Sequence, residues 1–267
     1  MDGCLLDHNT YEWAPALPAL KTLERLGAKV ILTTSKTRAE VEYWQRLLEL
    51  RDPFIVENGG AVVAPEGGLP SVPDEARVER KSVVWVLGWP RNQVVHSLHR
   101  AAAESRCDIR GFSDMTVEEV ASHTNMPVEE AHLACRREYS EPFLLLTPKR
   151  EPALLRAFLM HGLKVTRGGR FYHAQRHSGK GEAVARVVGL FEESREDVVT
   201  IGLGDGLNDE SFLRIVDYPV ILRSGQTDEL SRRVPHARVT KEAGPAAWGA
   251  AVLEILKEIE DNDGSAA

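Results

Sequence analysis

Two aspartates follow an apolar run in the last third of the chain. The run Val198–Ile201 has the composition of a short buried strand. The residues after it include Gly204, Asp205, Gly206, Asn208 and Asp209. Glycine lets the main chain approach a ligand closely, and carboxylate oxygens are ligands that Mg²⁺ prefers. A turn with a helix cap would use the same residue types, but so many polar and glycine residues directly after a buried strand favour a metal site.

Hydroxyl groups follow a second predicted strand, Val30–Thr33. The next residues are Thr34, Ser35, Lys36 and Thr37. Hydroxyl and main-chain N–H groups between a strand and a helix suit the oxygens of a phosphate. Thr37 begins a T-x-x-E capping box, which leaves Thr34 available for a ligand.

A lysine opens a later predicted helix, Lys180–Phe191. Lysine at such a position is ordinarily a solvated surface charge. Lys180 would take part in chemistry only if it faced the same ends of the strands, where its charge would attract a phosphate.

The segments on either side of these groups predict the fold. Helical spacing over Leu17–Leu26 stops at Gly27, and the strand Val30–Thr33, a helix after Thr37 and the strand Phe54–Val56 follow. Strands alternating with helices predict an α/β fold with a Rossmann-like parallel sheet. Ligands bind such sheets beyond the carboxyl ends of the strands, where the groups above would lie.

The middle of the chain departs from this alternation and predicts an inserted α+β cap domain over 78–164. Its expected strands are Ser82–Leu87 and Phe143–Leu146; its expected helices lie near Asn92–Glu104, Thr116–Thr124, after Pro127 and at Glu151–His161. The core domain would then comprise 1–77 and 165–267, with a strand at Val220–Leu222 and a last helix at Ala247–Ile259.

Composition excludes several classes of protein. The 267 residues carry a net charge of −7, with 43% hydrophobic residues and 3 cysteines. A disordered chain is excluded, no basic stripe for nucleic acid is present, and no disulfide framework is expected. Without an apolar run of about 18 residues or a basic leader, we expect no membrane segment, no signal peptide and a cytoplasmic location.

Four motifs occur in the order typical of haloacid dehalogenase-like phosphatases. They are Met1-Asp2-Gly3-Cys4, Thr34, Lys180 and Gly204-Asp205-Gly206-Leu207-Asn208-Asp209. Longer segments, among them PFIVENGGA, REYSEPF and GGRFYHAQRHSGKG, resemble the mannosyl-3-phosphoglycerate phosphatases of that superfamily. These segments are spread over nearly the whole chain, and such enzymes produce the compatible solute mannosylglycerate.

The resemblance implies a Mg²⁺-dependent reaction through an aspartyl phosphate. Asp2 would protonate the leaving oxygen and activate water, and would join Asp205 and Asp209 around the metal. Asp205 would hold Mg²⁺ with Asp209 assisting or orienting. Thr34 and Lys180 would bind the phosphoryl oxygens and offset their charge.

The same resemblance puts the nucleophilic aspartate two positions before Asp2, ahead of Met1. We therefore expect a truncated first core strand and a misplaced start within an Asp-Met-Asp-Gly motif. The chain as it stands is expected to be inactive, and destabilised because a central parallel strand is buried on both faces. The alternative is a non-catalytic remnant that begins at Met1 and senses phosphorylated metabolites.

The cap and the loops are expected to bind a small sugar phosphate. The predicted substrate-binding residues are Ser35, Lys36, Asn58, Gly59, Arg137, Arg170, His173, Ser178 and Asn208. Arginine matches a carboxylate or phosphate with two donors, although Arg137 could simply offset a helix dipole. Asn58 and Gly59 could instead form only a turn, and lone histidines are more often structural. Another sugar-phosphate phosphatase, for example one that acts on glucosyl-3-phosphoglycerate, and a phosphomutase are the other enzyme hypotheses.

Overall fold

The computed structural model describes residues 1–79, 81–168, 171–176, 179–195 and 197–265. The chain divides into two compact units, Met1–Leu32 with Lys180–Ala267, and Thr33–Gly179. The first unit is therefore built from two separate stretches of sequence. None of the described helices is both long and apolar enough to cross a lipid bilayer.

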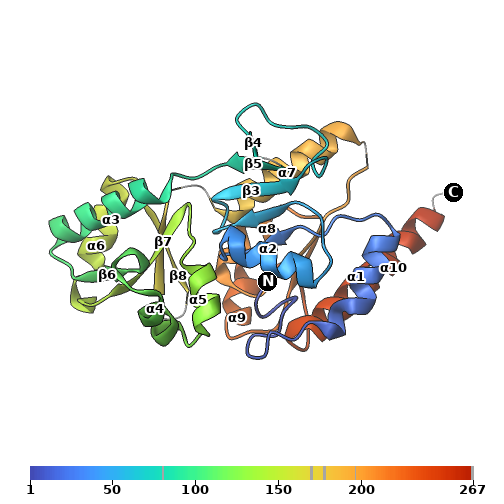
Figure 1. The fold of residues 1–267 in the computed structure, drawn as a ribbon. Helices are drawn as coiled ribbons and strands as arrows, with labels where there is room; N and C mark the ends of the chain where they lie inside the picture. Colours follow the sequence, from blue (N-terminus) through green and yellow to red (C-terminus); the bar gives the residue numbers. More distant parts are fainter. Residues whose placement is uncertain (80, 169–170, 177–178, 196, 266–267) are drawn as a thin grey trace. The chain divides into compact units, whose positions relative to one another are not determined.

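The first unit contains a parallel sheet with helices beside it (Figure 1). The strand order is β10-β11-β12, with β10 at Ile201–Gly204, β11 at Tyr218–Ile221 and β12 at Arg238–Val239. Both pairings are parallel. The helices are α1 (Leu17–Arg25), α7 (Lys180–Ser194), α8 (Glu210–Leu213), α9 (Thr227–Arg233) and α10 (Gly244–Ser265), with 3₁₀ turns η1 (Ala14–Ala16) and η4 (Leu207–Asp209). This arrangement confirms the predicted α/β class.

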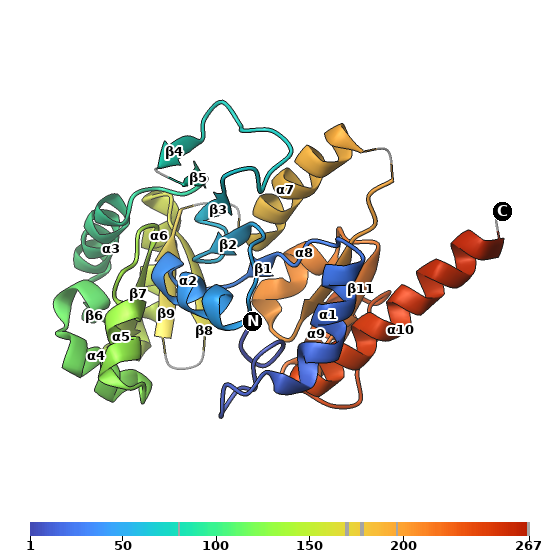
Figure 2. The same cartoon turned by 45° about the vertical axis from the view of Figure 1, so that its right-hand side comes forward.

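Local sequence explains where several of these elements lie. Helix α1 ends before Gly27, whose φ of +67° favours glycine. Helices α8 and α9 cover β11 through one apolar cluster, made of Phe212, Leu213, Ile221, Leu230 and Val234. Helix α10 packs against α1 and η1, and Figure 2 shows α1 and α10 running side by side.

Strand β10 corrects the expected strand at Val198–Ile201. The observed strand begins at Ile201 and ends at Gly204, and Val199 is 52% exposed. A Cβ atom on Gly202 would lie 2.8 Å from a methyl carbon of Val216, and one on Gly204 would lie 2.6 Å from Cβ of Asp209. The prediction was wrong because these glycines belong to the strand, where close packing excludes a side chain.

The second unit contains a five-stranded sheet of order β1-β2-β3-β5-β4. Its strands are β1 (Leu32–Thr33), β2 (Phe54–Val56), β3 (Ala61–Pro65), β4 (Arg77–Glu79) and β5 (Ser82–Val86). Helix α2 (Arg38–Leu47) follows β1, and the structure confirms the capping box at Thr37. Strands β2, β3, β5 and β4 pair antiparallel.

The same unit contains a four-stranded antiparallel sheet of order β6-β7-β9-β8. Its strands are β6 (Ile109–Gly111), β7 (Ser140–Leu145), β8 (Lys164–Gly168) and β9 (Phe171–Gln175). The helices are α3 (Arg91–Ser105), α4 (Val117–Thr124), α5 (Val128–Ala134) and α6 (Glu151–Met160), with 3₁₀ turns η2 (Phe112–Asp114) and η3 (Pro148–Arg150). The four strands of this sheet lie close together in both ribbon views (Figures 1 and 2).

Sheet membership changes the interpretation of the middle of the chain. The strand expected at Ser82–Leu87 pairs with β3, so it belongs to the five-stranded sheet. Strands β8 and β9, which the sequence analysis did not identify, pair with each other and with β7. The division into 1–77, 78–164 and 165–267 stays a prediction.

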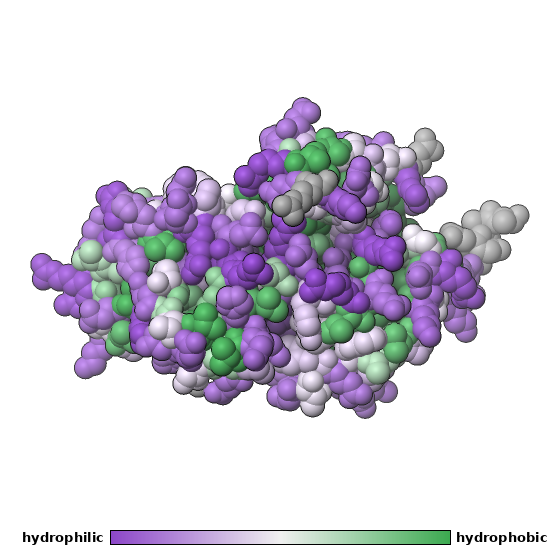
Figure 3. Space-filling model, in the orientation of Figure 1, coloured by the Kyte–Doolittle hydropathy of each residue, from purple (hydrophilic) through white to green (hydrophobic). Residues whose placement is uncertain are grey.

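The surface in Figure 3 is largely hydrophilic, with apolar residues in separate groups. The most exposed large apolar side chains include Leu159 and Met160 of α6, which are 76% and 85% exposed. Scattered exposure of this kind is ordinary for a folded chain.

Candidate active site

The first unit brings Asp209 and Lys180 into direct contact. The ammonium nitrogen of Lys180 donates a hydrogen bond of 2.6 Å to Oδ1 of Asp209. The other oxygen, Oδ2, accepts from the main-chain N–H groups of Asp205 and Gly206, each at 3.1 Å. Burial alone would raise the pKa of Asp209, but the Lys180 ammonium and these N–H groups hold it below its ordinary value. The contact therefore keeps both charges in a buried position.

Asp205 lies against the beginning of the chain. The thiol of Cys4 donates to Oδ1 of Asp205 at 3.2 Å. A Cβ atom on Gly3 would lie only 2.5 Å from Oδ2 of Asp205, and Gly3 has a φ of +71°. Glycine is thus required both by the backbone and by the carboxylate next to it. Burial raises the pKa of Asp205, whereas the ammonium groups of the N-terminus and Lys180 oppose that effect.

The carboxylates of Asp205 and Asp209 have the chemistry that Mg²⁺ binding uses. Mg²⁺ takes one or two carboxylates and completes its octahedron with water and substrate phosphate oxygens. Asp205 fits that use, since it is a half-buried carboxylate contacted by a weak thiol donor and closely approached by Gly3. Both carboxylate oxygens of Asp209 accept hydrogen bonds from protein donors, so this residue is suited to orient Lys180 and the main chain of the loop. No three His, Cys, Asp or Glu side chains among the described residues are placed to hold a metal together.

Asp2 and Asn208 also lie in the first unit. Asp2 forms an isolated parallel bridge with Leu6, one residue before the glycine that contacts Asp205. Asn208 lies within η4, and a Cβ atom on Gly206 would come within 2.6 Å of its Oδ1. The structure therefore groups Asp2, Lys180, Asp205, Asn208 and Asp209 in one unit, while their predicted roles stay predictions.

The second unit fixes the loop around Thr34. Thr34 is 3% exposed, and its hydroxyl accepts from the main-chain N–H of Lys36 at 3.2 Å. The N–H of Asn58 donates to the Thr34 carbonyl at 2.8 Å, and the N–H of Glu57 donates to the Lys36 carbonyl at 3.0 Å. Glu57 and Asn58 have φ values of +49° and +59°, an uncommon conformation for two consecutive non-glycine residues. This turn therefore holds the loop that carries the predicted phosphoryl ligands.

A buried acid supports the same loop and was missed by the sequence analysis. Glu57 is 0% exposed and accepts from Ser140 Oγ at 2.5 Å and from the N–H groups of Glu138 and Tyr139. Arg137 lies 3.5 Å from Glu57 and donates to the Ser35 carbonyl at 2.7 Å. The sequence signal was the motif ENGG, which was interpreted either as lining the substrate cleft or as forming only a turn.

The remaining predicted ligands lie in the second unit or outside the described part. Lys36 is 7% exposed and forms an ion pair with Glu40 at 3.6 Å. Gly59 follows the left-handed pair at Glu57 and Asn58 with a φ of +102°. His173 is a residue of β9. Arg170 and Ser178 lie outside the described residues.

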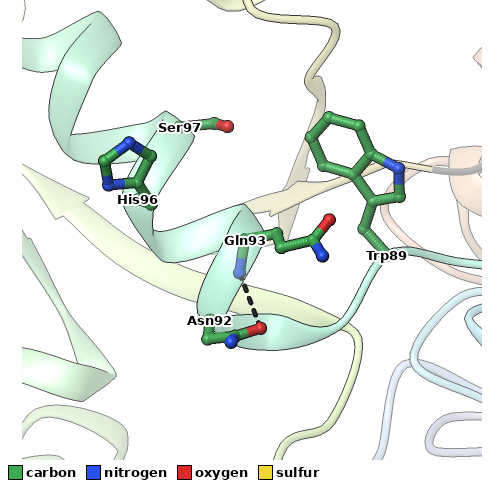
Figure 4. Close-up of a pocket in the computed structure, with 5 residues that line it drawn as sticks. All are labelled: Trp89, Asn92, Gln93, His96 and Ser97. Atoms are coloured by element: carbon green, nitrogen blue, oxygen red, sulfur yellow. Dashed lines mark hydrogen bonds between the residues drawn. The ribbon is translucent and has the colours of Figure 1, made fainter.

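A hollow of about 410 Å³ lies beside helix α3 (Figure 4). Its lining residues are Trp89, Asn92, Gln93, His96 and Ser97. The guanidinium carbon of Arg176 lies 3.4 Å from the centre of the Trp89 ring. This stacking accounts for the position of the indole, and the hollow contains none of the predicted site residues.

Comparison with solved structures shows the class of fold. A haloacid dehalogenase-like hydrolase from Bacteroides thetaiotaomicron has a TM-score of 0.65 at 17% identity, covering 97% of this chain and 96% of the other. A sugar phosphatase of subclass IIB of the superfamily has a TM-score of 0.64, also at 17% identity, covering 97% and 96%. The chain therefore has the haloacid dehalogenase-like fold, as the four motifs implied.

Comparison with curated proteins shows the family within that class. The chain is 36% identical to the glucosyl-3-phosphoglycerate/mannosyl-3-phosphoglycerate phosphatase of Persephonella marina, over 97% of this chain and 96% of the relative. It is 34% identical to the phosphatase of the same description from Methanococcoides burtonii, over 96% and 95%. The mannosyl-3-phosphoglycerate phosphatase of Pyrococcus furiosus is 34% identical over 79% and 85%. No family model matches the chain.

The chain belongs to the mannosyl-3-phosphoglycerate phosphatase family, whose members are phosphoric monoester hydrolases. The family resemblance predicted from the sequence is thus confirmed.

Proposed function

We propose that the protein hydrolyses mannosyl-3-phosphoglycerate to mannosylglycerate and phosphate, and accepts the glucosyl compound as a second substrate. Relatives that align with nearly the whole chain are named for both substrates. The buried contact between Lys180 and Asp209 beside Asp205 carries the proposal. It supplies the positive charge and carboxylates that phosphoryl transfer requires.

We propose that Asp2 and Asp205 hold Mg²⁺ and that Asp209 orients Lys180 and the main chain of the loop. When bound, the ion would neutralise charge on the phosphoryl oxygens. The ammonium group of Lys180 binds a phosphoryl oxygen, and Asp209 fixes its position. Thr34 contributes a hydroxyl group held in place by Lys36 N–H.

The proposed route passes through an aspartyl phosphate. A carboxylate oxygen attacks phosphorus, the bond from phosphorus to the glycerate oxygen breaks, and Asp2 protonates that oxygen. Asp2 then takes a proton from water, whose oxygen attacks phosphorus. The bond from phosphorus to the carboxylate oxygen breaks, which releases phosphate and restores the carboxylate. By motif position the attacking aspartate lies two residues before Asp2, ahead of residue 1 of this sequence.

The test measures phosphate released from mannosyl- and glucosyl-3-phosphoglycerate, with Mg²⁺ and with a chelator. The 267-residue chain is compared with a chain extended by an apolar strand that ends in Asp directly before Met1. We expect Mg²⁺-dependent release from the extended chain and its loss in Asp205→Asn. Asp217→Asn, which changes an exposed aspartate bound to Thr200, is the matched control. No release by either chain under any of these conditions would contradict the proposal.

A further inference from the structure

Strand β9 has one apolar face and one face that changes from apolar to polar. Tyr172 and Ala174 belong to the cluster formed with helices α3 and α6. Successive side chains of a strand point to opposite faces, so Phe171, His173 and Gln175 share the other face. Phe171 packs there with residues of α4 and α5. The polar residues of this face, His173 and Gln175, therefore follow Phe171 and its apolar cluster along the strand.

Two buried polar atoms on this face lack hydrogen-bond partners in the described structure. They are Nδ1 of His173 and Oε1 of Gln175. Gln175 is 1% exposed. An acceptor removed from water without a partner is destabilising, so a second group that supplies the missing bond is expected.

The neighbouring strands place further hydroxyl groups on the same face. Thr166 of β8 and Pro142 of β7 lie directly opposite His173, whereas Lys164 of β8 and Ser140 of β7 lie directly opposite Gln175. Residues directly opposite each other in an antiparallel pair share a face. Ser140 already donates to Glu57. The polar residues of this face, His173, Gln175, Thr166, Ser140 and Lys164, form a patch across three strands, which we name the β9 patch.

The chemistry of the two atoms without partners, Nδ1 of His173 and Oε1 of Gln175, selects uncharged hydroxyl groups. An amide oxygen can only accept, so the phosphate and carboxylate oxygens of an ionised phosphoglycerate cannot satisfy Gln175. Burial, with the nearby Arg137 charge, lowers the pKa of His173 to about 3, so this ring is neutral at physiological pH. A neutral ring does not attract an anion through charge. Hydroxyl groups both donate and accept, and they match both atoms.

We propose that the β9 patch binds the sugar hydroxyls of the substrate, with Gln175 and His173 as the contacting residues. The inference rests on the proposed function for the identity of the sugar. It assigns to Gln175 a role in sugar specificity that the sequence analysis did not predict, and it gives His173 a neutral hydroxyl as its partner.

The test compares a substrate with and without the sugar. Gln175→Leu removes the amide, and mannosyl-3-phosphoglycerate and 3-phosphoglycerate are assayed with the extended chain used in the test of the proposed function, with and without this substitution. We expect KM for the sugar-bearing substrate to rise at least about tenfold in the variant, because the sugar hydroxyl loses its acceptor. KM for 3-phosphoglycerate should stay unchanged. The melting temperature should not fall, because leucine removes a buried acceptor without a partner.

Tyr172→Phe is the matched control, since it removes a hydroxyl from the opposite face of the same strand, where it donates to Glu151. An equal change in KM for both substrates, or no change in KM for either, would overturn the inference. Gln175 would then contact only a buried water. If neither substrate is hydrolysed, calorimetric titration with mannosylglycerate decides separately. Weaker binding by Gln175→Leu than by wild type supports the patch, and equal or absent binding rejects it.

Discussion

The ammonium nitrogen of Lys180 lies 2.6 Å from Oδ1 of Asp209, and the two side chains are only 5% and 7% exposed. Lys180 begins α7, whereas Asp209 ends the turn after β10. The contact thus joins two motifs that are 29 residues apart. A buried pair of this kind is costly to break, because the remaining charge loses its partner.

Replacing Lys180 with methionine should therefore affect stability as well as catalysis. We expect Lys180→Met to lower the free energy of unfolding by about 3 kcal/mol, because Asp209 is left buried and charged. Arg186→Ala is the control, since its ion pair with Glu182 is exposed and should contribute under about 1 kcal/mol. Urea unfolding followed by circular dichroism measures both. Similar losses in the two variants would contradict the expectation.

A methyl group at Gly204 should be poorly tolerated. Its Cβ would lie 2.6 Å from Cβ and 2.8 Å from Oδ2 of Asp209, so the loop must shift. We expect Gly204→Ala to lower the free energy of unfolding by about 1–3 kcal/mol and to reduce kcat. Gly189→Ala in α7 meets no atom within 4 Å and should raise stability by up to about 1 kcal/mol. Thermal unfolding distinguishes the two directions.

The carboxylate of Glu57 should stabilise the second unit strongly. Glu57→Ala leaves the Arg137 guanidinium buried without its acid, and we expect a loss of about 3–5 kcal/mol. Glu79→Ala is the comparison, because Glu79 is 45% exposed in its ion pair with Arg38 and should cost under about 1 kcal/mol. Chemical denaturation provides the values. A loss at Glu57 no larger than that at Glu79 would refute the importance of the buried network.

The neutral His173 ring predicts a particular pH dependence. Its folded pKa, about 3, lies below the unfolded value of 6.5, so the unfolded chain binds the extra proton between these values. Stability attributable to His173 is therefore present above pH 6.5 and is lost as the pH falls towards 3. Between pH 6.5 and 3, we expect the free energy of unfolding of His173→Gln to fall by a few kcal/mol less than that of the wild type. Each pKa unit corresponds to about 1.4 kcal/mol. Parallel unfolding curves across the window would contradict this.

Local signals in the sequence predicted the local features well. The capping box at Thr37 and the glycine stop after α1 are set by neighbouring residues, and both are present. The motifs likewise placed Lys180, Asp205 and Asp209 in the candidate site, because the family pattern fixes their order. The contacts of Asp209 with Lys180 and with the main chain of Asp205 depend on the folded structure of the first unit.

Pairing between distant segments was not predicted. The strand Ser82–Val86 looks the same in sequence whether it joins β3 or β7, because the choice depends on partners elsewhere in the chain. Glu57 was overlooked because its hydrogen-bond donors come from residues 138–140. No local sequence pattern marks Gln175 as functional. The sign of a role is that its Oε1 atom is buried without a hydrogen-bond partner among the described residues.

The division of the chain has a consequence for the order in which the protein forms during synthesis. Thr33–Gly179 is a continuous stretch, so it can fold on the ribosome as soon as it has emerged. Met1–Leu32 precedes this stretch but forms a unit with Lys180–Ala267, so the first unit cannot form until residues beyond Lys180 have been made. The contact of Cys4 with Asp205 joins residues that are 201 positions apart. Closing so long a loop costs conformational entropy, and no contact with Asp205 can offset that cost before Asp205 has been made. The carboxylates of Asp205 and Asp209 are therefore made after the whole of the second unit, so a chain interrupted before Lys180 lacks both of them.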